Sequence, residues 1–199
     1  MPFEDELGDG VTVHPYRPSW ATEAADLATT LSRAVRSAVA VEHIGSTAVA
    51  GMSAKDVLDM MVVVPDPTAS DVEHDLTWLG YRRRPEPWNN SEPAAGRHWP
   101  KMTFAPPVGG RAQNIHVRAV GSPTLRLALL FRDHLRASPQ RTAWWSELKT
   151  AAAAVAPDLA AYGRLKYPAW CLLMELAETW ARDTGWRPPD HGLLAGDDV

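Results

Sequence analysis

Apolar residues in the first half of the chain follow two patterns, one with a helical period and one typical of buried strands. Between residues 20 and 38 they recur every three or four positions, directly after Ser19, which can cap a helix. Residues 57–64, VLDMMVVV, are almost all apolar, as expected of a central strand covered on both faces. The pattern also predicts a short strand at 41–44 and a helix at 69–79.

The second half of the chain predicts three more strands followed by helices. Strands at 99–105 and 112–120 are separated by PPVGG, a turn sequence that favours a hairpin. Another strand is expected at 81–85, and the stretch PEPWNNSEPAAG that follows it is expected to be a mobile loop. Helices are expected at about 123–137, 139–155 and 158–180, and Pro168 should kink or divide the last of them.

These elements suggest how the chain is organised. We expect an α/β core over residues 1–121, C-terminal helices packed on or beside it over 122–185, and a tail over 186–199. A length of 199 residues fits one domain with a helical appendage.

Polar side chains collect on one face of the predicted sheet. Because side chains alternate along a strand, Asn114, His116 and Arg118 share one face of theirs. Lys101 can join that face from the neighbouring strand, and Asp59 interrupts the long apolar strand. A carboxylate, an imidazole, an amide and two cations together suit an anionic or metal-bound ligand. A solvated antiparallel face is the alternative interpretation.

Composition and charge bear on the expected partners and cellular location of the protein. The formal net charge of −4 gives no reason to expect nucleic acid or an anionic membrane as a partner. A single cysteine, Cys171, cannot form an internal disulfide, which favours a reducing compartment. With no signal-peptide pattern and no apolar run of about 20 residues, we expect a cytoplasmic location and no membrane partner. The oligomeric state stays open.

The segment VEHIGSTAVAGMSAKDVLDMMVVV resembles the GrpB family, whose domain is also found fused to dephospho-CoA kinase. Its matching residues are Glu42, His43, Gly45, Ser46, Thr47, Val49, Gly51, Lys55 and Asp59. Further ordered matches are YRPSW at 16–20, NIHV at 114–117 and FRDHLRASP at 131–139. Lys149, Tyr162 and Lys166 fit the family's helical lysine and tyrosine positions, although Lys149 also suits a solvated helix face. The resemblance spans roughly residues 16–175.

GrpB proteins are similar to the nucleotidyltransferase superfamily, and this resemblance implies a fold. We therefore expect an α+β protein, with a nucleotidyltransferase-like mixed sheet, helices packed on one face and a C-terminal helical segment. In that superfamily a Gly-Ser turn at a helix N-terminus holds nucleotide phosphates. Carboxylates on neighbouring strands hold two Mg²⁺ ions.

The chain keeps only part of that signature. Gly45 and Ser46 match, and Asp59 follows thirteen positions after Ser46. Met61 stands where a second carboxylate is expected, and a thioether is a poor ligand for Mg²⁺. The third carboxylate position corresponds to Asn114 or His116.

Three functional hypotheses follow. The first is a transferase with a degenerate metal site that acts on a nucleotide or another phosphate-containing small molecule. The second is a non-catalytic ligand-binding module, and the third is an enzyme of different chemistry, such as ligation or rearrangement in specialised metabolism. The catalytic candidates are Asp59 and His116, with Asp59 also the candidate Mg²⁺ ligand. The candidate substrate-binding residues are Gly45, Ser46, Thr47, Lys55, Lys101, Asn114, Arg118 and Lys166.

Two alternatives concern metal binding. Asp56 could serve as a second acid, although its strand parity differs from that of Asp59. His43 and His116 could join Asp59 to hold a softer metal such as Zn²⁺ or Mn²⁺.

Overall fold

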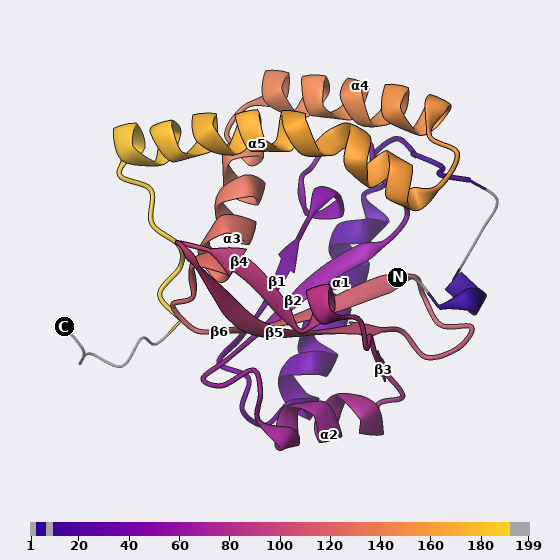
Figure 1. Ribbon diagram of the computed structural model, residues 1–199, viewed down its shortest axis with the longest axis vertical. Coiled ribbons are helices and arrows are strands. Elements are labelled where there is room, and N and C mark those ends of the chain that lie inside the picture. Colours follow the sequence, from indigo (N-terminus) through magenta and orange to yellow (C-terminus); the bar gives the residue numbers. More distant parts are fainter. Residues whose placement is uncertain (1–2, 7–9, 192–199) are drawn as a thin grey trace.

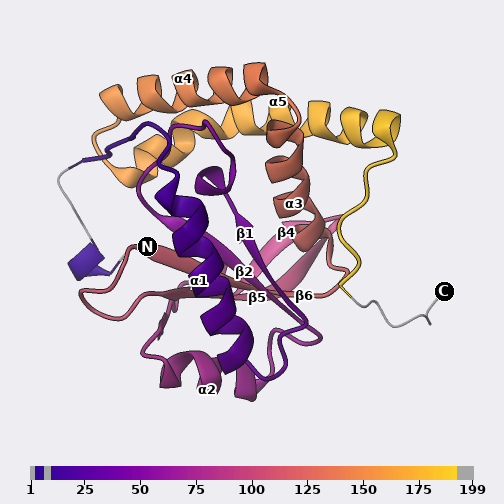
Figure 2. The ribbon, with the colours of Figure 1, turned by 180° about the vertical axis from the view of Figure 1, so that it is seen from behind.

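The computed structural model describes residues 3–6 and 10–191, and shows a mixed sheet between two groups of helices (Figure 1). The helices on one face are α1 (Ser19–Ala34) and α2 (Ser70–Trp78), seen in front of the sheet or below it in Figure 2. The helices on the other side are α3 (Pro123–Arg136), α4 (Pro139–Val155) and α5 (Leu159–Thr184). None of the helices in this described part combines the length and apolarity needed to cross a bilayer.

The sheet has six strands, which lie between residues 40 and 119. Its strands are β1 (Ala40–Ile44), β2 (Leu58–Val64), β3 (Arg82–Arg83), β4 (Ser91–Ala94), β5 (Arg97–Ala105) and β6 (Gln113–Ala119). Their order is β1-β2-β6-β5-β3, and β4 pairs with β5 beside this path. Only β2 and β6 run parallel, and the other pairs are antiparallel. The predicted pairing of the strands around PPVGG is confirmed.

Strand β2 is covered on both faces, as its apolar run predicts. Met60 and Val62 pack against α1 and α2 in the larger core cluster. Met61 and Val63 point to the opposite face, where they pack against Leu125 of α3. Burial on both faces explains why this strand tolerates almost no polar residue except at its beginning, where Asp59 lies.

The strand register gathers the polar residues that alternation predicts on one face. Asp59 is opposite Asn114, and His116 is opposite Thr103. Arg118 is opposite Lys101 in the same pair of strands, two residues from His116 and therefore on the same face. The candidate site is therefore part of the sheet surface that faces α3 and α5.

Three details differ from the elements expected from the sequence. The stretch expected to be a mobile loop contains β4, whose Pro93 is tolerated because β4 pairs on one side only. The strand expected at 81–85 is reduced to β3, because Pro85 follows and cannot donate a ladder hydrogen bond. Helix α5 continues through Pro168, so of the expected kink or division only the division is wrong.

Candidate functional site

Asp59 is fixed at the start of β2 by two neighbours on β6. Asn114 Nδ2 donates to Asp59 Oδ1 at 2.9 Å, and His116 Nε2 lies 3.6 Å from the same oxygen. Both contacts use Oδ1, so Oδ2 is left without a hydrogen bond among the described residues. The carboxylate therefore has one held oxygen and one that is available to a ligand.

The surroundings of Asp59 keep it ionised. Burial raises its pKa, but the contacts with His116 and Asn114 and the charge of Lys55 outweigh burial and leave the pKa below its ordinary value. Burial lowers the pKa of His116 more than the neighbouring Asp59 raises it. At neutral pH the pair is thus a carboxylate beside a neutral imidazole.

Gly45 makes room for this carboxylate. Its φ of +70° is one that residues with a side chain rarely adopt. A Cβ placed there would lie 2.5 Å from Asp59 Oδ2. The Gly-Ser turn therefore brings the backbone directly against the free oxygen of Asp59.

A first cavity, the lysine cavity, lies on one side of Asp59 and has a volume of about 200 Å³. Its walls come from the Gly-Ser turn, β2, β6, α4 and α5. The lining residues are Ser46, Thr47, Ala54, Lys55, Val57, Asp59, Asn114, Lys149, Tyr162 and Lys166. Five of the predicted binding residues therefore meet here, namely Ser46, Thr47, Lys55, Asn114 and Lys166. Lys149 and Tyr162, from the C-terminal helices, were not predicted to bind a ligand.

Lys149 overturns the interpretation of a solvated helix face. Its side chain is only 2% exposed, and its ammonium donates to the carbonyl oxygen of Ser53. It belongs to the buried stripe of α4 that also contains Thr142, Trp145 and Ala152. This stripe packs toward the core, so Lys149 reaches the cavity from inside the helical layer.

Burial lowers the pKa of all three lysines of this cavity. Desolvation, with a smaller effect of Lys166, lowers the pKa of Lys149 to about 7. Desolvation also lowers the pKa of Lys166 to about 8 and lowers that of Lys55. Burial therefore disfavours the charged form of each of these three lysines.

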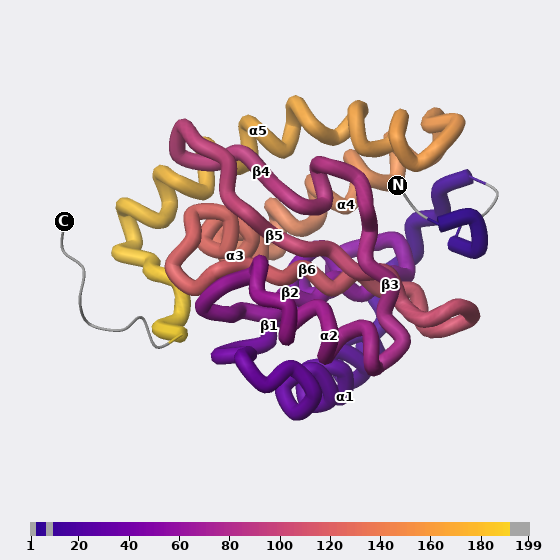
Figure 3. The backbone as a smooth tube through the Cα atoms, turned by 60° about the horizontal axis from the view of Figure 1, so that its bottom comes forward, coloured from indigo at the N-terminus to yellow at the C-terminus, as the bar shows by residue number. Residues whose placement is uncertain are grey.

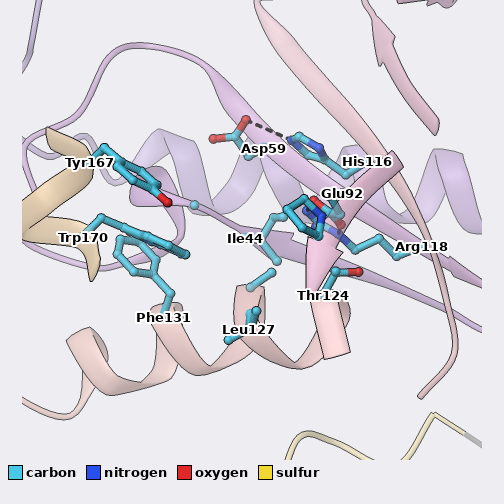
Figure 4. Close-up of a pocket in the computed structure, with 13 residues that line it drawn as sticks. Ile44, Asp59, Glu92, His116, Arg118, Thr124, Leu127, Phe131, Tyr167 and Trp170 are labelled. Atoms are coloured by element: carbon cyan, nitrogen blue, oxygen red, sulfur yellow. Dashed lines mark hydrogen bonds and ion pairs between the residues drawn. The ribbon is translucent and has the colours of Figure 1, made fainter. Parts of the chain in front are cut away.

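A second cavity, the aromatic cavity, lies on the other side of Asp59 and has a volume of about 440 Å³ (Figure 4). One wall is apolar and comes from α3 and α5. Within it, Tyr167 and Trp170 stack with ring centroids 6.0 Å apart and an angle of 18° between their planes. The facing wall is the polar sheet surface, with Asp59, His116 and Arg118. No pattern in the sequence predicted this aromatic wall.

Glu92 of β4 neutralises the two sheet cations. Arg118 donates to both of its carboxylate oxygens, at 2.6 and 3.1 Å, and Lys101 donates at 3.1 Å. These contacts, with burial opposing them, lower the pKa of Glu92 to about 2. Lys101 and Arg118 were expected to be free for a ligand, but the structure pairs both with β4, which lies beside α3 in Figure 3.

Other predicted residues have structural partners. The hydroxyl of Thr47 contacts His43 Nε2 at 2.9 Å and donates to the carbonyl of Val57. Ser46 begins a 3-10 helix of only three residues, so it is a hydroxyl in the cavity wall and not the start of a long helix.

The residues present do not fit a two-metal centre. Met61 is fully buried, and its Sδ is 3.5 Å from the guanidinium Nη1 of Arg118, so a fixed cation already occupies that side. Asp56 cannot serve as the second acid, because it binds Trp20 and the guanidinium groups of Arg17 and Arg111. Within residues 3–6 and 10–191, no group of three or more His, Cys, Asp or Glu side chains could hold a metal ion, which also removes the His43–His116–Asp59 alternative.

The fold is of the α+β class, with a six-stranded mixed sheet and helices on both of its sides. The sequence model of the family described as GrpB protein matches residues 10–174, and the chain belongs to the GrpB family. This confirms the resemblance drawn from the motif around Gly45 and Asp59.

Relatives and a solved structure agree with this assignment. A dephospho-CoA kinase of Mycolicibacterium paratuberculosis is 32% identical over 89% of this chain and 48% of its own length. UPF0157 protein PA4798 of Pseudomonas aeruginosa is 34% identical over 79% of this chain and 64% of its own length. The crystal structure of GrpB from Enterococcus faecalis matches with a TM-score of 0.71 and 23% identity, over 85% of this chain and 99% of that one. The chain spans about half the length of the dephospho-CoA kinases that it matches.

Proposed function

We propose that this GrpB-family chain binds a nucleotide, with its phosphates in the lysine cavity and its nucleoside in the aromatic cavity. The observation that carries this proposal is that Asp59 lies in the walls of both cavities. A ligand that fills both would place the junction between nucleoside and phosphates beside the free Oδ2. Relatives named dephospho-CoA kinases are consistent with a ligand of this class.

The chemistry of the two cavities matches the two parts of a nucleotide: one cavity has an aromatic wall and the other is cationic. Stacked Tyr167 and Trp170 offer flat apolar surface for a base. The sheet wall opposite carries Arg118, and Thr124 lines the cavity from the first turn of α3; their polar atoms can contact ring edges or ribose hydroxyls. The lysine cavity supplies Ser46 and cations for phosphate oxygens.

Group transfer at Asp59 is the chemistry that this arrangement supports best. The ionised Oδ2 would accept the proton of a hydroxyl or amine on a second substrate as that atom attacks phosphorus. A new bond to phosphorus forms, the bridging P–O bond breaks, and the leaving phosphate keeps the electron pair next to the lysines. Asn114 and His116 act as positioning residues, because both contact Oδ1.

A non-catalytic ligand-binding module is the second candidate. Met61 favours it, since this buried thioether replaces an oxygen ligand of the metal-dependent transferases. The two candidates share the binding step and differ only in turnover.

Calorimetry with ATP, GTP, CTP and UTP tests the binding step. Trp170→Ala removes half of the stacked pair and should weaken the preferred nucleotide by roughly fivefold or more, the effect of one lost base–aromatic contact. Trp144→Ala is the matched control, because Trp144 is 61% exposed on α4 and lines neither cavity. Equal affinity in wild type and Trp170→Ala would contradict a nucleoside in the aromatic cavity.

Turnover separates the two candidates. The nucleotide that binds is incubated with the protein and candidate acceptors, and released phosphates and adducts are followed by mass spectrometry. Transfer by wild type that falls at least about a hundredfold in Asp59→Asn, at unchanged nucleotide affinity, supports Asp59 as the base. Tight binding without any product, across hydroxyl and amine acceptors, supports the binding module.

A further inference from the structure

Lysine is rare in this chain and is concentrated in one place. The sequence contains four lysines, and three of them, Lys55, Lys149 and Lys166, line the lysine cavity. The fourth, Lys101, is bound to Glu92. The three come from separate parts of the fold, namely the loop before β2 and the helices α4 and α5.

These three cations lack the ion pairs that most buried charges have. Among the described residues, none of the three has a carboxylate within ion-pair distance, whereas Lys101 does. Of the cavity-lining residues in the described part of the chain, Asp59 alone is acidic. Three positive charges against one negative charge leave two uncompensated when all three lysines are protonated.

Burying an uncompensated ammonium destabilises a protein unless a partner is supplied. Lys149 has only the Ser53 carbonyl, and the ammonium of Lys166 lies 4.0 Å from the ring centroid of Tyr162. The three lysines and Ser46 all line the same cavity. This arrangement suits a ligand that brings at least two negative charges and several acceptor oxygens.

We propose that Lys55, Lys149 and Lys166 form a polyphosphate site that binds two or more linked phosphates without a divalent cation. The lysines supply the positive charge that carboxylate-held metal ions provide in a two-metal site, and Met61 beside Arg118 leaves no place for the second ion. This site deepens the proposed function. It rests on that function only in the expectation that the bound phosphates are attached to a nucleoside.

The sign of the magnesium effect follows from this arrangement. Mg²⁺ bound to a polyphosphate in solution lowers the negative charge of that ligand and occupies its oxygens. The lysines then lose both attraction and hydrogen-bond acceptors. Magnesium should therefore weaken binding, the opposite of its effect on a metal-dependent site.

Isothermal calorimetry on the full chain tests the proposal, with sodium tripolyphosphate, pyrophosphate and orthophosphate in EDTA and then in excess Mg²⁺. We expect affinity to increase from orthophosphate to pyrophosphate and tripolyphosphate, and to fall when Mg²⁺ is added. No binding in EDTA, or binding that Mg²⁺ tightens, overturns the proposal. Citrate binding as tightly as tripolyphosphate would also overturn it, because the site would then select ligands by negative charge and not for linked phosphates.

Lysine variants locate the site. Lys166→Met and Lys149→Met should each weaken tripolyphosphate by about tenfold or more, the effect of one lost charge-assisted contact. Arg33→Met is the charge-matched control, because Arg33 is exposed on α1 across the sheet from the cavity. Lys166→Met keeps the test decisive if Lys149→Met fails to fold, since Lys166 is only partly buried. Wild-type affinity in Lys166→Met overturns the assignment.

The same titrations distinguish this inference from the proposed function. If nucleotides bind but inorganic polyphosphates do not, the polyphosphate site is wrong and the nucleotide proposal stands. If inorganic polyphosphates bind in EDTA and nucleoside triphosphates bind no more tightly, the polyphosphate site stands and the aromatic cavity does not hold a nucleoside.

Discussion

At the scale of single residues, the free oxygen of Asp59 depends on the absence of a side chain at position 45. Gly45→Ala would add a Cβ 2.5 Å from Oδ2, on a backbone with φ of +70°. We expect the substitution to lower the free energy of unfolding by about 2–4 kcal/mol, since positive φ and the clash both contribute. It should also displace the carboxylate and weaken the nucleotide-binding affinity of the protein. Urea unfolding and calorimetry measure the two effects.

Gly51→Ala is the matched control for this prediction. Gly51 has a φ of +80°, but a Cβ there would meet nothing within 4 Å. Its cost should be limited to backbone strain, about 1 kcal/mol. Equal losses of stability in the two variants would show that Gly45 is not in close contact with Asp59.

Strand alternation was enough to predict which residues share the sheet face. The period of two along each strand and the pairing of β2 with β6 are enough to put Asp59, Asn114 and His116 on one face. The structure brings these three side chains together. Lys149 and Glu92 could not be placed in this way, because each reaches the site from an element packed over the sheet. For Lys149 a signal did exist, since it falls in the helical stripe with Trp145.

At the scale of elements, β4 is held by backbone pairing with β5 and by one side chain, Glu92, that binds cations of the sheet face. Glu92→Gln would remove the charge that Arg118 and Lys101 share and leave two cations largely buried. We expect a loss of about 2–3 kcal/mol in the free energy of unfolding, below the full cost for a wholly buried pair because these groups keep some exposure. Hydrogen exchange should be faster at Ser91–Ala94.

Glu73→Gln on α2 is the control for Glu92→Gln. Glu73 also pairs with an arginine, Arg83, but both side chains are more than a third exposed. Its removal should change the free energy of unfolding by less than about 1 kcal/mol. Unchanged exchange rates across β4 in Glu92→Gln would mean that backbone pairing with β5 alone holds this strand.

The elements differed in how well local sequence predicted them. Strand β2 followed from its apolar run, because burial on both faces leaves a strong pattern. The sequence of β4 predicts a loop, because a short strand that contains Pro93 and pairs only with β5 has no alternation of apolar and polar residues. The aromatic wall was missed since it forms only when α5 folds back over α3.

At the scale of the whole molecule, the buried lysines of the lysine cavity should make the free energy of unfolding depend on pH. The pKa of Lys149 is about 7 in the folded chain and 10.5 ordinarily, and the pKa of Lys166 is about 8. Between these limits the unfolded chain binds protons that the folded chain does not, so the free energy of unfolding rises with pH. Each lysine contributes a slope of at most ~1.4 kcal/mol per pH unit, and Lys166 less because it is partly exposed.

The last prediction uses this dependence to join stability with binding. Lys149 feels the charge of Lys166 and shares the cavity wall with Lys55, Asp59 and Tyr162. A bound polyphosphate would return protons to the lysines, so its affinity should fall as pH rises from 7 to 9.5 and binding should take up protons. Urea unfolding over this range should give a rising free energy for wild type and Arg33→Met, and a flatter one for Lys149→Met. Calorimetry in buffers of different ionisation enthalpy counts the protons taken up. Two results would contradict this prediction: the same pH slope of the unfolding free energy in Lys149→Met as in wild type, or polyphosphate binding without proton uptake at pH 8. Either would show that the three lysines already have partners that keep them protonated without a bound anion.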